Sequence, residues 1–145
     1  MYKFTVSTRI PFGDSVRIDL ETGKLSETGN LEIHAVEATD SVTEQQRLGI
    51  KMDLHGGGLA ATAEEKMFQA PEGEYSPGRE ILGPARWPSE EGRFYAKTGS
   101  GKYAAIYILA SPLPRRRDTS IYVVIYYNPS GSRNLRFDQK KLLNQ

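Results

Sequence analysis

Apolar and polar residues alternate along much of this chain. The alternation runs through residues 1–12, 16–20, 31–35 and 50–54, and successive side chains of a strand point to opposite faces of its sheet. Each segment therefore predicts a strand that buries one face and leaves the other in contact with water. Proline and glycine at positions 11 and 13 end the first strand, and further turn-forming residues separate the others.

The residues with the highest β-propensity lie in the C-terminal third, which we expect to form the centre of the fold. Residues 121–127 are seven consecutive β-branched or aromatic residues, a composition typical of strands. Residues 94–109 predict a second long strand, and the glycines within 98–103 predict a hairpin turn. A basic, proline-broken loop joins the two, and a turn at 128–134 precedes a last short strand. Because neither face of 121–127 is polar, we expect both faces to be covered, or one covered and the other adhesive.

The middle of the chain gives weaker patterns. Residues 39–48 fit a short helix or a polar loop equally well, since Ser41 and Glu44 have capping-box spacing. Residues 59–68 contain alanines, which favour a helix, but they lack a strong apolar stripe. Residues 69–91 contain several prolines and glycines and predict a long irregular segment over the surface.

Together these patterns predict an all-β fold of about seven to nine short strands. We expect an antiparallel β-sandwich or a partly open barrel, with at most one or two short helices. The chain of 145 residues is long enough for one domain with a substantial core. We therefore expect residues 1–145 to form a single β-rich domain.

The charge balance and the absence of cysteine argue against several classes of function. The 19 basic and 18 acidic residues give a net charge of +1, whereas nucleic-acid-binding proteins usually carry a strongly basic face. We therefore expect no nucleic-acid partner. Without cysteine the chain has no disulfide, thiolate metal site or cysteine nucleophile. No stretch approaches the ~20 apolar residues that span a bilayer, and residues 1–12 do not form the apolar run of a signal peptide.

One glycine-rich string matches part of a catalytic motif. His55-Gly56-Gly57-Gly58 is similar to the oxyanion-hole sequence of some lipases and esterases, whose glycine amides face a developing alkoxide. Those enzymes also need a serine in a G-x-S-x-G elbow, and the chain contains no such motif. Three glycines after a strand more often form a turn, so we expect no catalytic residues and keep a small hydrolase as an alternative.

The two histidines of the chain raise the question of a metal site. Asp53 and His55 are two residues apart and would share one face of a strand. With His34 they could provide two imidazoles and one carboxylate, but the sequence does not say whether the strands that carry them are neighbours. A histidine near a strand end is more often a surface residue, so we expect no metal and no cofactor.

Aromatic residues concentrate in the last third of the chain and are its most suggestive feature. Tyrosines on a sheet face can stack on sugar rings or form a protein-binding surface, because the ring is apolar and its tip is polar. The alternative is that most of them pack in the core or pair across strands. The candidate ligand-binding residues are Trp87, Tyr103, Tyr107, Tyr122 and Tyr126.

Three segments carry a resemblance to a known kind of domain: residues 68–75, two short motifs within 94–104, and the string Asn-Pro-Ser-Gly-Ser-Arg-Asn-Leu at 128–135. In this order they resemble a β-rich domain of uncharacterised bacterial proteins that are often exported or located on the cell surface. The resemblance covers about the last 80 residues. Similar sequences usually carry an acidic residue directly after the last motif, where this chain has Arg136, so no charge-based role carries over. The resemblance implies an accessory or binding module in an exported or surface location.

We therefore expect a non-catalytic β-sandwich module that binds a carbohydrate or another protein through an aromatic sheet face. The reason is the density of tyrosines in the absence of a catalytic constellation. Two alternatives stay open. One is a small hydrolase that uses Asp53, His55 and the glycine turn, and the other is a structural domain of a surface assembly.

Overall fold

The computed structural model describes residues 1–39, 46–64, 66–84, 90–136 and 143–144 of the chain. These residues form ten strands and no helix. The strands are β1 (Tyr2–Pro11), β2 (Ser15–Ile18), β3 (Leu31–Thr39), β4 (Gln46–Leu54), β5 (Gly58–Ala61), β6 (Gly78–Pro84), β7 (Glu90–Lys97), β8 (Tyr103–Leu113), β9 (Asp118–Asn128) and β10 (Leu143–Asn144).

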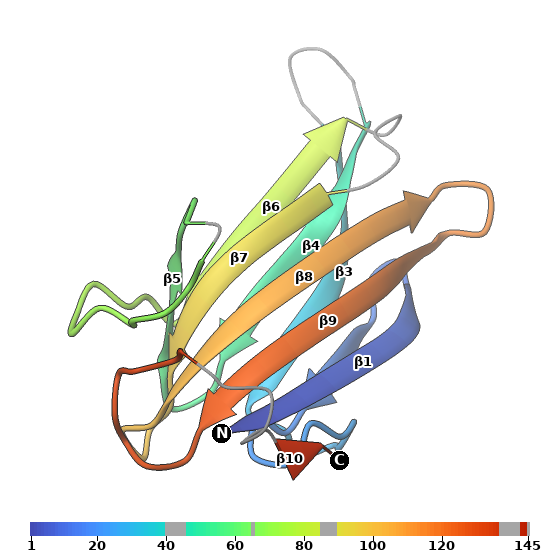
Figure 1. Ribbon diagram of the computed structural model, residues 1–145. Coiled ribbons are helices and arrows are strands. Elements are labelled where there is room, and N and C mark those ends of the chain that lie inside the picture. The colour runs from blue at the N-terminus through green and yellow to red at the C-terminus, as the bar shows by residue number, and fades with distance from the viewer. Residues whose placement is uncertain (40–45, 65, 85–89, 137–142, 145) are drawn as a thin grey trace.

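The strands form two sheets that pack face to face (Figure 1). Sheet A has six strands in the order β10-β1-β9-β8-β7-β5, and sheet B has four in the order β2-β3-β4-β6. All pairings are antiparallel except the short parallel pairing of β1 with β10. Neither sheet closes on itself, so the fold is an antiparallel β-sandwich, as the sequence predicts. In the described part of the chain, no helix has the length and hydropathy needed to cross a membrane.

Strand β9 lies in the middle of sheet A, which confirms the prediction for residues 121–127. It pairs with β1 on one side and with β8 on the other. Its inward-pointing side chains, Ile121, Val123, Ile125 and Tyr127, are at most 2% exposed. Strand β9 therefore contributes to the core along most of its length.

The core fills the space between the inner faces of the two sheets. Phe4 and Ile106 reach into it from sheet A, and Ile33 and Met52 reach into it from sheet B. Each of these side chains is at most 2% exposed. Burial of one such side chain stabilises the fold by about 1.5–3 kcal/mol, so the alternation seen in the sequence is enforced by this core.

The chain passes from sheet B to sheet A at a tight corner between β4 and β5. The amide of His55 donates a hydrogen bond to the carbonyl of Asn30 at 2.8 Å. A side chain at position 57 would collide with the carbonyl of Lys97 in β7. The corner therefore requires Gly57, because only glycine lets the two backbones approach this closely.

The prediction of one long strand over residues 94–109 is wrong, because this region contains β7 and β8. The hairpin turn predicted for 98–103 is confirmed and separates the two strands. The amide of Thr98 donates to the carbonyl of Lys102 at 2.8 Å, and Gly101 has a φ of 80°. Glycine adopts this left-handed conformation without strain. Gly101 therefore allows the chain to turn between β7 and β8, where a single strand cannot continue.

The weaker predictions for the middle of the chain need correction. The helical alternative for 59–68 is wrong for its first residues, because β5 pairs with β7 at the edge of sheet A. The irregular segment predicted for 69–91 is wrong over β6, which pairs with β4, and at residues 90–91, which begin β7 and pair with β8. Of residues 39–48, position 39 belongs to β3 and positions 46–48 to β4, while 40–45 lie outside the described residues.

The last strand is also misplaced in the prediction. Residues 135 and 136, which directly follow the turn at 128–134, belong to no strand. Leu135 is 1% exposed and packs with residues of sheet A and of the segment after β5. The described strand near the C-terminus is β10.

Candidate functional site

Four of the tyrosines singled out by the sequence lie together on the outer face of sheet A. Tyr103 and Tyr107 come from β8, and Tyr122 and Tyr126 come from β9. They alternate with core residues of the same strands, so the pleat turns them away from sheet B. The fifth candidate, Trp87, lies outside the described residues.

These tyrosines differ in how much of each ring is accessible. Tyr103 is only 7% exposed, and its ring centroid lies 6.3 Å from that of Tyr75. Tyr107 and Tyr126 are half-buried and meet edge to face, with ring centroids 6.0 Å apart. Tyr122 is 47% exposed. The accessible aromatic surface therefore belongs to Tyr107, Tyr122 and Tyr126, and Tyr103 lies under cover.

Leu109 extends this surface. It pairs with Tyr122 across the β8–β9 ladder, and it is 41% exposed. We call Tyr107, Leu109, Tyr122 and Tyr126 the aromatic patch. Neighbouring large apolar side chains at the surface are a common feature of binding sites.

Two segments cover the other end of the same outer face. They are residues 62–64 and 66–76, which follow β5, and residues 129–136, which follow β9; Figure 1 shows both at one end of sheet A. The amide of Leu135 joins them by donating to the carbonyl of Phe68 at 2.8 Å. Met67 and Leu135 are at most 3% exposed, so the cover buries part of an otherwise open sheet face.

A pocket with a volume of about 190 Å³ lies where this cover meets the aromatic patch. A backbone hydrogen bond from Met67 reaches the Tyr107 hydroxyl at the pocket wall, and burial raises the pKa of Tyr107. That hydroxyl therefore stays protonated at neutral pH. The pocket is lined by Lys66, Met67, Phe68, Ala105, Tyr107, Tyr126 and Leu135.

Basic side chains border the aromatic patch. Lys3 Nζ lies 5.8 Å from the ring centroid of Tyr126, and Lys66 lines the pocket. The guanidinium carbon of Arg136 lies 5.5 Å from the ring centroid of Phe68. A cation near the face of an aromatic ring is electrostatically favourable, and these three basic side chains lie at the edge of the patch and its pocket.

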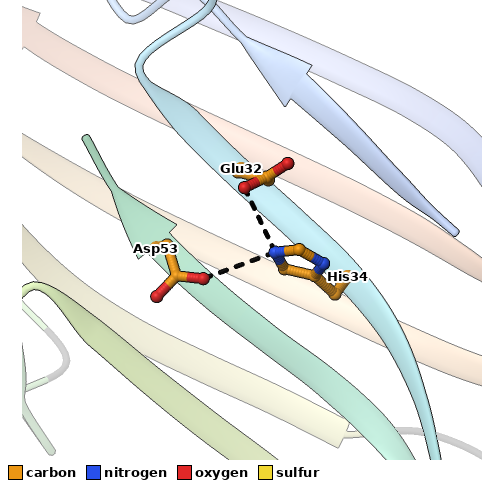
Figure 2. A group of neighbouring side chains, drawn as sticks. All are labelled: Glu32, His34 and Asp53. Carbon is orange, nitrogen blue, oxygen red and sulfur yellow. Dashed lines mark ion pairs between the residues drawn. The ribbon is translucent and has the colours of Figure 1, made fainter. Parts of the chain in front are cut away.

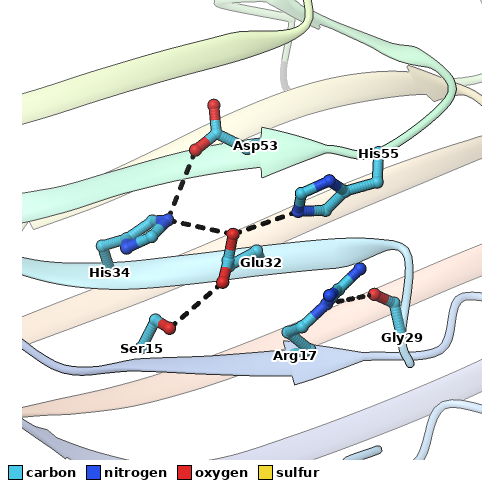
Figure 3. Close-up of polar contacts among 7 residues, drawn as sticks. All are labelled: Ser15, Arg17, Gly29, Glu32, His34, Asp53 and His55. Atoms are coloured by element: carbon cyan, nitrogen blue, oxygen red, sulfur yellow. Dashed lines mark hydrogen bonds and ion pairs between the residues drawn. The ribbon is translucent and has the colours of Figure 1, made fainter. Parts of the chain in front are cut away.

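The outer face of sheet B brings both histidines of the chain together with two carboxylates. His34 Nε2 lies 3.2 Å from Glu32 Oε1 and 3.3 Å from Asp53 Oδ2 (Figure 2). His55 Nε2 lies 3.0 Å from the same Glu32 oxygen, on the other side of that side chain (Figure 3). We call Glu32, His34, Asp53 and His55 the histidine–carboxylate cluster.

The pairing of β3 with β4 builds this cluster. Residues 32–34 and 53–55 both have the order acid, apolar residue, histidine. Their middle residues are at most 2% exposed and point into the core, so the acids and histidines point outward. Glu32 pairs directly with Asp53. Because the strands are antiparallel, the two histidines lie at opposite ends of the pair of acids.

Polar neighbours hold the carboxylate of Glu32 in its ionised form. The hydrogen bond with His55 lowers the pKa of Glu32 below its ordinary value, against the opposing effect of partial burial. A hydrogen bond from Ser15 Oγ to Glu32 Oε2, at 3.2 Å, acts in the same direction. Arg17 Nε donates instead to the carbonyl of Gly29 at 2.7 Å (Figure 3). Glu32 is therefore the centre of the cluster, with contacts on both carboxylate oxygens.

A glycine makes room for the carboxylate of Asp53. Gly78 of β6 pairs with Asp53, and a side chain at this position would collide with Asp53 Oδ1. The small residue on the neighbouring strand thus leaves space for the Asp53 carboxylate beside His34.

The glycine turn of the hydrolase alternative lies at the sheet-to-sheet corner. The amide of Gly57 donates to the carbonyl of Leu54 at 3.2 Å, so one of the glycine amides is used within the turn. His55 and Asp53 share an outward face, as predicted, and the ring of His55 contacts Glu32.

The sequence-based hypothesis of a metal site includes three of the four cluster residues as possible ligands and does not include Glu32. His34, Asp53 and His55 were recognised as possible ligands, and the structure brings them to one face around Glu32. A signal for Glu32 was present in the repeated order of acid, apolar residue and histidine. Two such tripeptides on paired antiparallel strands place all four polar side chains on one face.

Comparison with known proteins adds no family. No protein-family model matches the chain, and no curated protein matches its sequence.

Proposed function

We propose that this protein is a non-catalytic binding module that holds an acidic carbohydrate against the aromatic patch of sheet A. The observation that carries the proposal is that Tyr107, Tyr122 and Tyr126 share the outer face of two adjacent central strands. The rings of Tyr107 and Tyr126 meet edge to face, and Tyr122 pairs with Leu109 further along the same two strands. Strands paired on both sides form a rigid support, so the rings lose little freedom when a ligand binds.

The size of the patch favours a sugar chain over a protein partner. A stable protein interface buries roughly 800 Å² on each partner, and the patch consists of four side chains. The adjoining pocket has a volume of about 190 Å³, which is below the roughly 300–1,000 Å³ of sites for drug-sized ligands. A pocket of this size beside a flat aromatic surface suits one or a few sugar rings. The apolar face of a sugar can stack on a tyrosine ring while its hydroxyls reach the tyrosine tips.

The border of the patch favours an acidic sugar. Lys3 and Lys66 lie next to Tyr126 and the pocket, and Arg136 lies next to Phe68. These cations would attract carboxylate or sulfate groups of a polysaccharide. Attraction between exposed charges is screened by salt, so binding of an acidic sugar should weaken as ionic strength rises, whereas stacking alone should not.

Isothermal titration calorimetry with acidic and neutral oligosaccharides tests the proposal. We expect binding of at least one acidic oligosaccharide and a loss of about 5- to 10-fold in affinity for Tyr122→Ala, as one aromatic contact of about 1 kcal/mol predicts. Leu25→Ala is the matched control, because Leu25 is 50% exposed but lies outside the patch. Its affinity should stay unchanged.

Three outcomes would overturn this function. One is the absence of heat across the whole oligosaccharide panel. Another is self-association in sedimentation velocity that Tyr122→Ala abolishes, which would assign the patch to contacts between copies of a structural domain. The third is turnover of generic ester substrates that His55→Ala removes, which would support the hydrolase alternative.

A further inference from the structure

We propose that the histidine–carboxylate cluster of sheet B is a binding site for a divalent transition-metal ion, and that Zn²⁺ is the ion that its donors fit best. This site lies on the sheet opposite the aromatic patch and is independent of the carbohydrate proposal. Figures 2 and 3 show its side chains gathered above β3 and β4.

The donor set selects the class of metal. Two imidazole nitrogens and two carboxylate oxygens form a mixed set of intermediate softness, which suits Zn²⁺ and its neighbours in the first transition row. Ca²⁺ and Mg²⁺ prefer shells made entirely of oxygen, and a site for soft ions would need thiolates. A carboxylate ligand also offers negative charge, which offsets the charge of a divalent ion.

The distances are close to those of a tetrahedral site. Ligand atoms that surround Zn²⁺ at about 2.0–2.2 Å lie about 3.3–3.6 Å from one another. His34 Nε2 lies 3.2 Å from Glu32 Oε1 and 3.3 Å from Asp53 Oδ2, and the three ligand atoms all lie within 4.8 Å of one another. Three ligands are therefore gathered before a metal arrives.

His55 is the fourth ligand in this proposal. Its Nε2 lies 3.0 Å from Glu32 Oε1, and its side chain is 47% exposed. A side chain at the surface can rotate toward the other three without disturbing the core. Until His55 rotates, the fourth position would be open to water, as in open metal sites.

The neighbours of the ligands act as supports. Ser15 holds the second oxygen of Glu32, and this contact leaves Oε1 directed at the histidines (Figure 3). Gly78 leaves space for the Asp53 carboxylate. Hydrogen-bonded partners that orient metal ligands typically change metal affinity by about 10- to 100-fold, so Ser15→Ala should weaken binding less than loss of a histidine does.

Calorimetric titration of the untagged full chain with ZnCl₂, after removal of metal with a chelator, tests the site. We expect saturable binding of one ion per chain. His34→Ala should lower the affinity at least about 10-fold, since a lost ligand costs no less than a lost supporting residue. The double variant His34→Ala/His55→Ala should not bind, because it retains neither imidazole nor thiol.

A matched control separates this site from general attraction to surface acids. Glu80 is an exposed carboxylate of β6 that pairs with Lys51, beside the cluster but not in it. Glu80→Gln should bind Zn²⁺ like the wild type. Circular dichroism of each variant checks the fold, which should be unchanged because the altered side chains lie at the surface.

Several results would overturn the proposal. Absence of saturable binding by the wild type at millimolar ZnCl₂ would show that the cluster is only a set of ion pairs. Undiminished binding by the double histidine variant would place the ion elsewhere, and tighter binding of Ca²⁺ than of Zn²⁺ would exclude the donor assignment. Tyr122→Ala should retain full Zn²⁺ affinity, so the metal site and the carbohydrate site can fail separately.

Discussion

The two outer faces of this sandwich use the same pleated backbone for opposite chemistry. Outward positions of the central strands β8 and β9 hold mostly tyrosines and apolar residues, and the segments 62–64, 66–76 and 129–136 cover part of them. Outward positions of sheet B near the corner hold acids and histidines that remain open to water, with 34% and 47% of the two histidine side chains exposed. The pleat decides which residues face outward, and the outward residues alone decide what each face can do.

The comparison of the two faces shows which residues should contribute to stability and which should contribute to binding. The outer face of sheet A contributes a second apolar cluster to the fold, whereas the cluster on sheet B consists of exposed polar contacts. Exposed ion pairs are worth little in stability. Changes on the covered part of sheet A should therefore destabilise the fold, and changes on the cluster should alter binding and leave the fold intact.

The largest effect is expected from loss of the residue that anchors the cover. Leu135 is 1% exposed, so Leu135→Ala should lower the free energy of unfolding by about 2–5 kcal/mol. Urea denaturation measures this change. Leu25→Ala, at a leucine that is 50% exposed, is the control and should change stability by no more than about 0.5 kcal/mol. Equal effects of the two substitutions would contradict the role of the cover.

Alkaline pH should destabilise the covered face next. Burial, with a smaller effect from Tyr103, raises the pKa of Tyr75 to about 12, and burial also raises the pKa values of Tyr95 and Tyr107 on the same face. A tyrosine in the unfolded chain ionises near pH 10, whereas these tyrosines keep their protons when folded. The folded state then binds more protons, so stability is unchanged up to about pH 10 and falls as pH rises toward about 12.

Urea denaturation between neutral pH and pH 11, combined with a spectrophotometric tyrosine titration, measures this effect. In the folded protein the covered tyrosines should ionise at a higher pH than in the urea-unfolded chain. A free energy of unfolding that stays constant across the alkaline range would show that the cover does not exclude water from these rings.

A single hydrogen bond of the cover should have a smaller effect. The Tyr95 hydroxyl donates to Glu64 Oε2 at 2.7 Å, and Tyr95 is 3% exposed. Tyr95→Phe removes this bond and should cost about 1 kcal/mol of stability, as measured by urea denaturation. Tyr122→Phe removes the hydroxyl of an exposed tyrosine and should be neutral. A neutral Tyr95→Phe would show that Glu64 does not hold the cover in place.

The smallest effect is expected on sheet B. In metal-free protein, Glu32→Gln should change the free energy of unfolding by less than about 1 kcal/mol, because exposed ion pairs contribute little. The pKa of Glu32 is lowered from 4.5, so the stability that this carboxylate contributes is present above about pH 4.5 and is lost as pH falls through its lower folded value. Acid titration of the two proteins by circular dichroism should show this small difference, and a large one would contradict the contrast between the faces.

The architecture could be predicted because a core enforces alternation. Residues 121–127 have β-branched and aromatic side chains, and their inward members fill the space between the sheets. Strands β5 and β6 could not be read in the same way. The alanines of β5 are small, and β6 begins with glycine and ends with glycine and proline. Each strand is held in place by pairing with a partner that is distant in sequence: β5 pairs with β7, and β6 pairs with β4. The local sequence does not reveal these pairings.

The candidate sites could be predicted only in part, for a related reason. The pleat predicts from sequence alone that Tyr122 and Tyr126 share one face of their strand, but it does not predict that Tyr103 is covered by segments that precede and follow it in the chain. The cluster depends on the pairing of Glu32 with Asp53, which alternation within one strand does not reveal. The sequence of one strand therefore predicts which residues share a face, whereas the pairing of strands in the folded protein decides which residues lie next to one another.

The pairing of β1 with β9 has a consequence for how the protein folds during its synthesis. Tyr2 pairs with Tyr127 and Pro11 with Asp118, so each contact closes a loop of more than 100 residues. Such distant contacts slow folding, because the chain loses much entropy before they form. During synthesis, β1 leaves the ribosome before β9 and cannot pair with it until β9 has been synthesised. Its unpaired edge is exposed to other nascent chains throughout that interval.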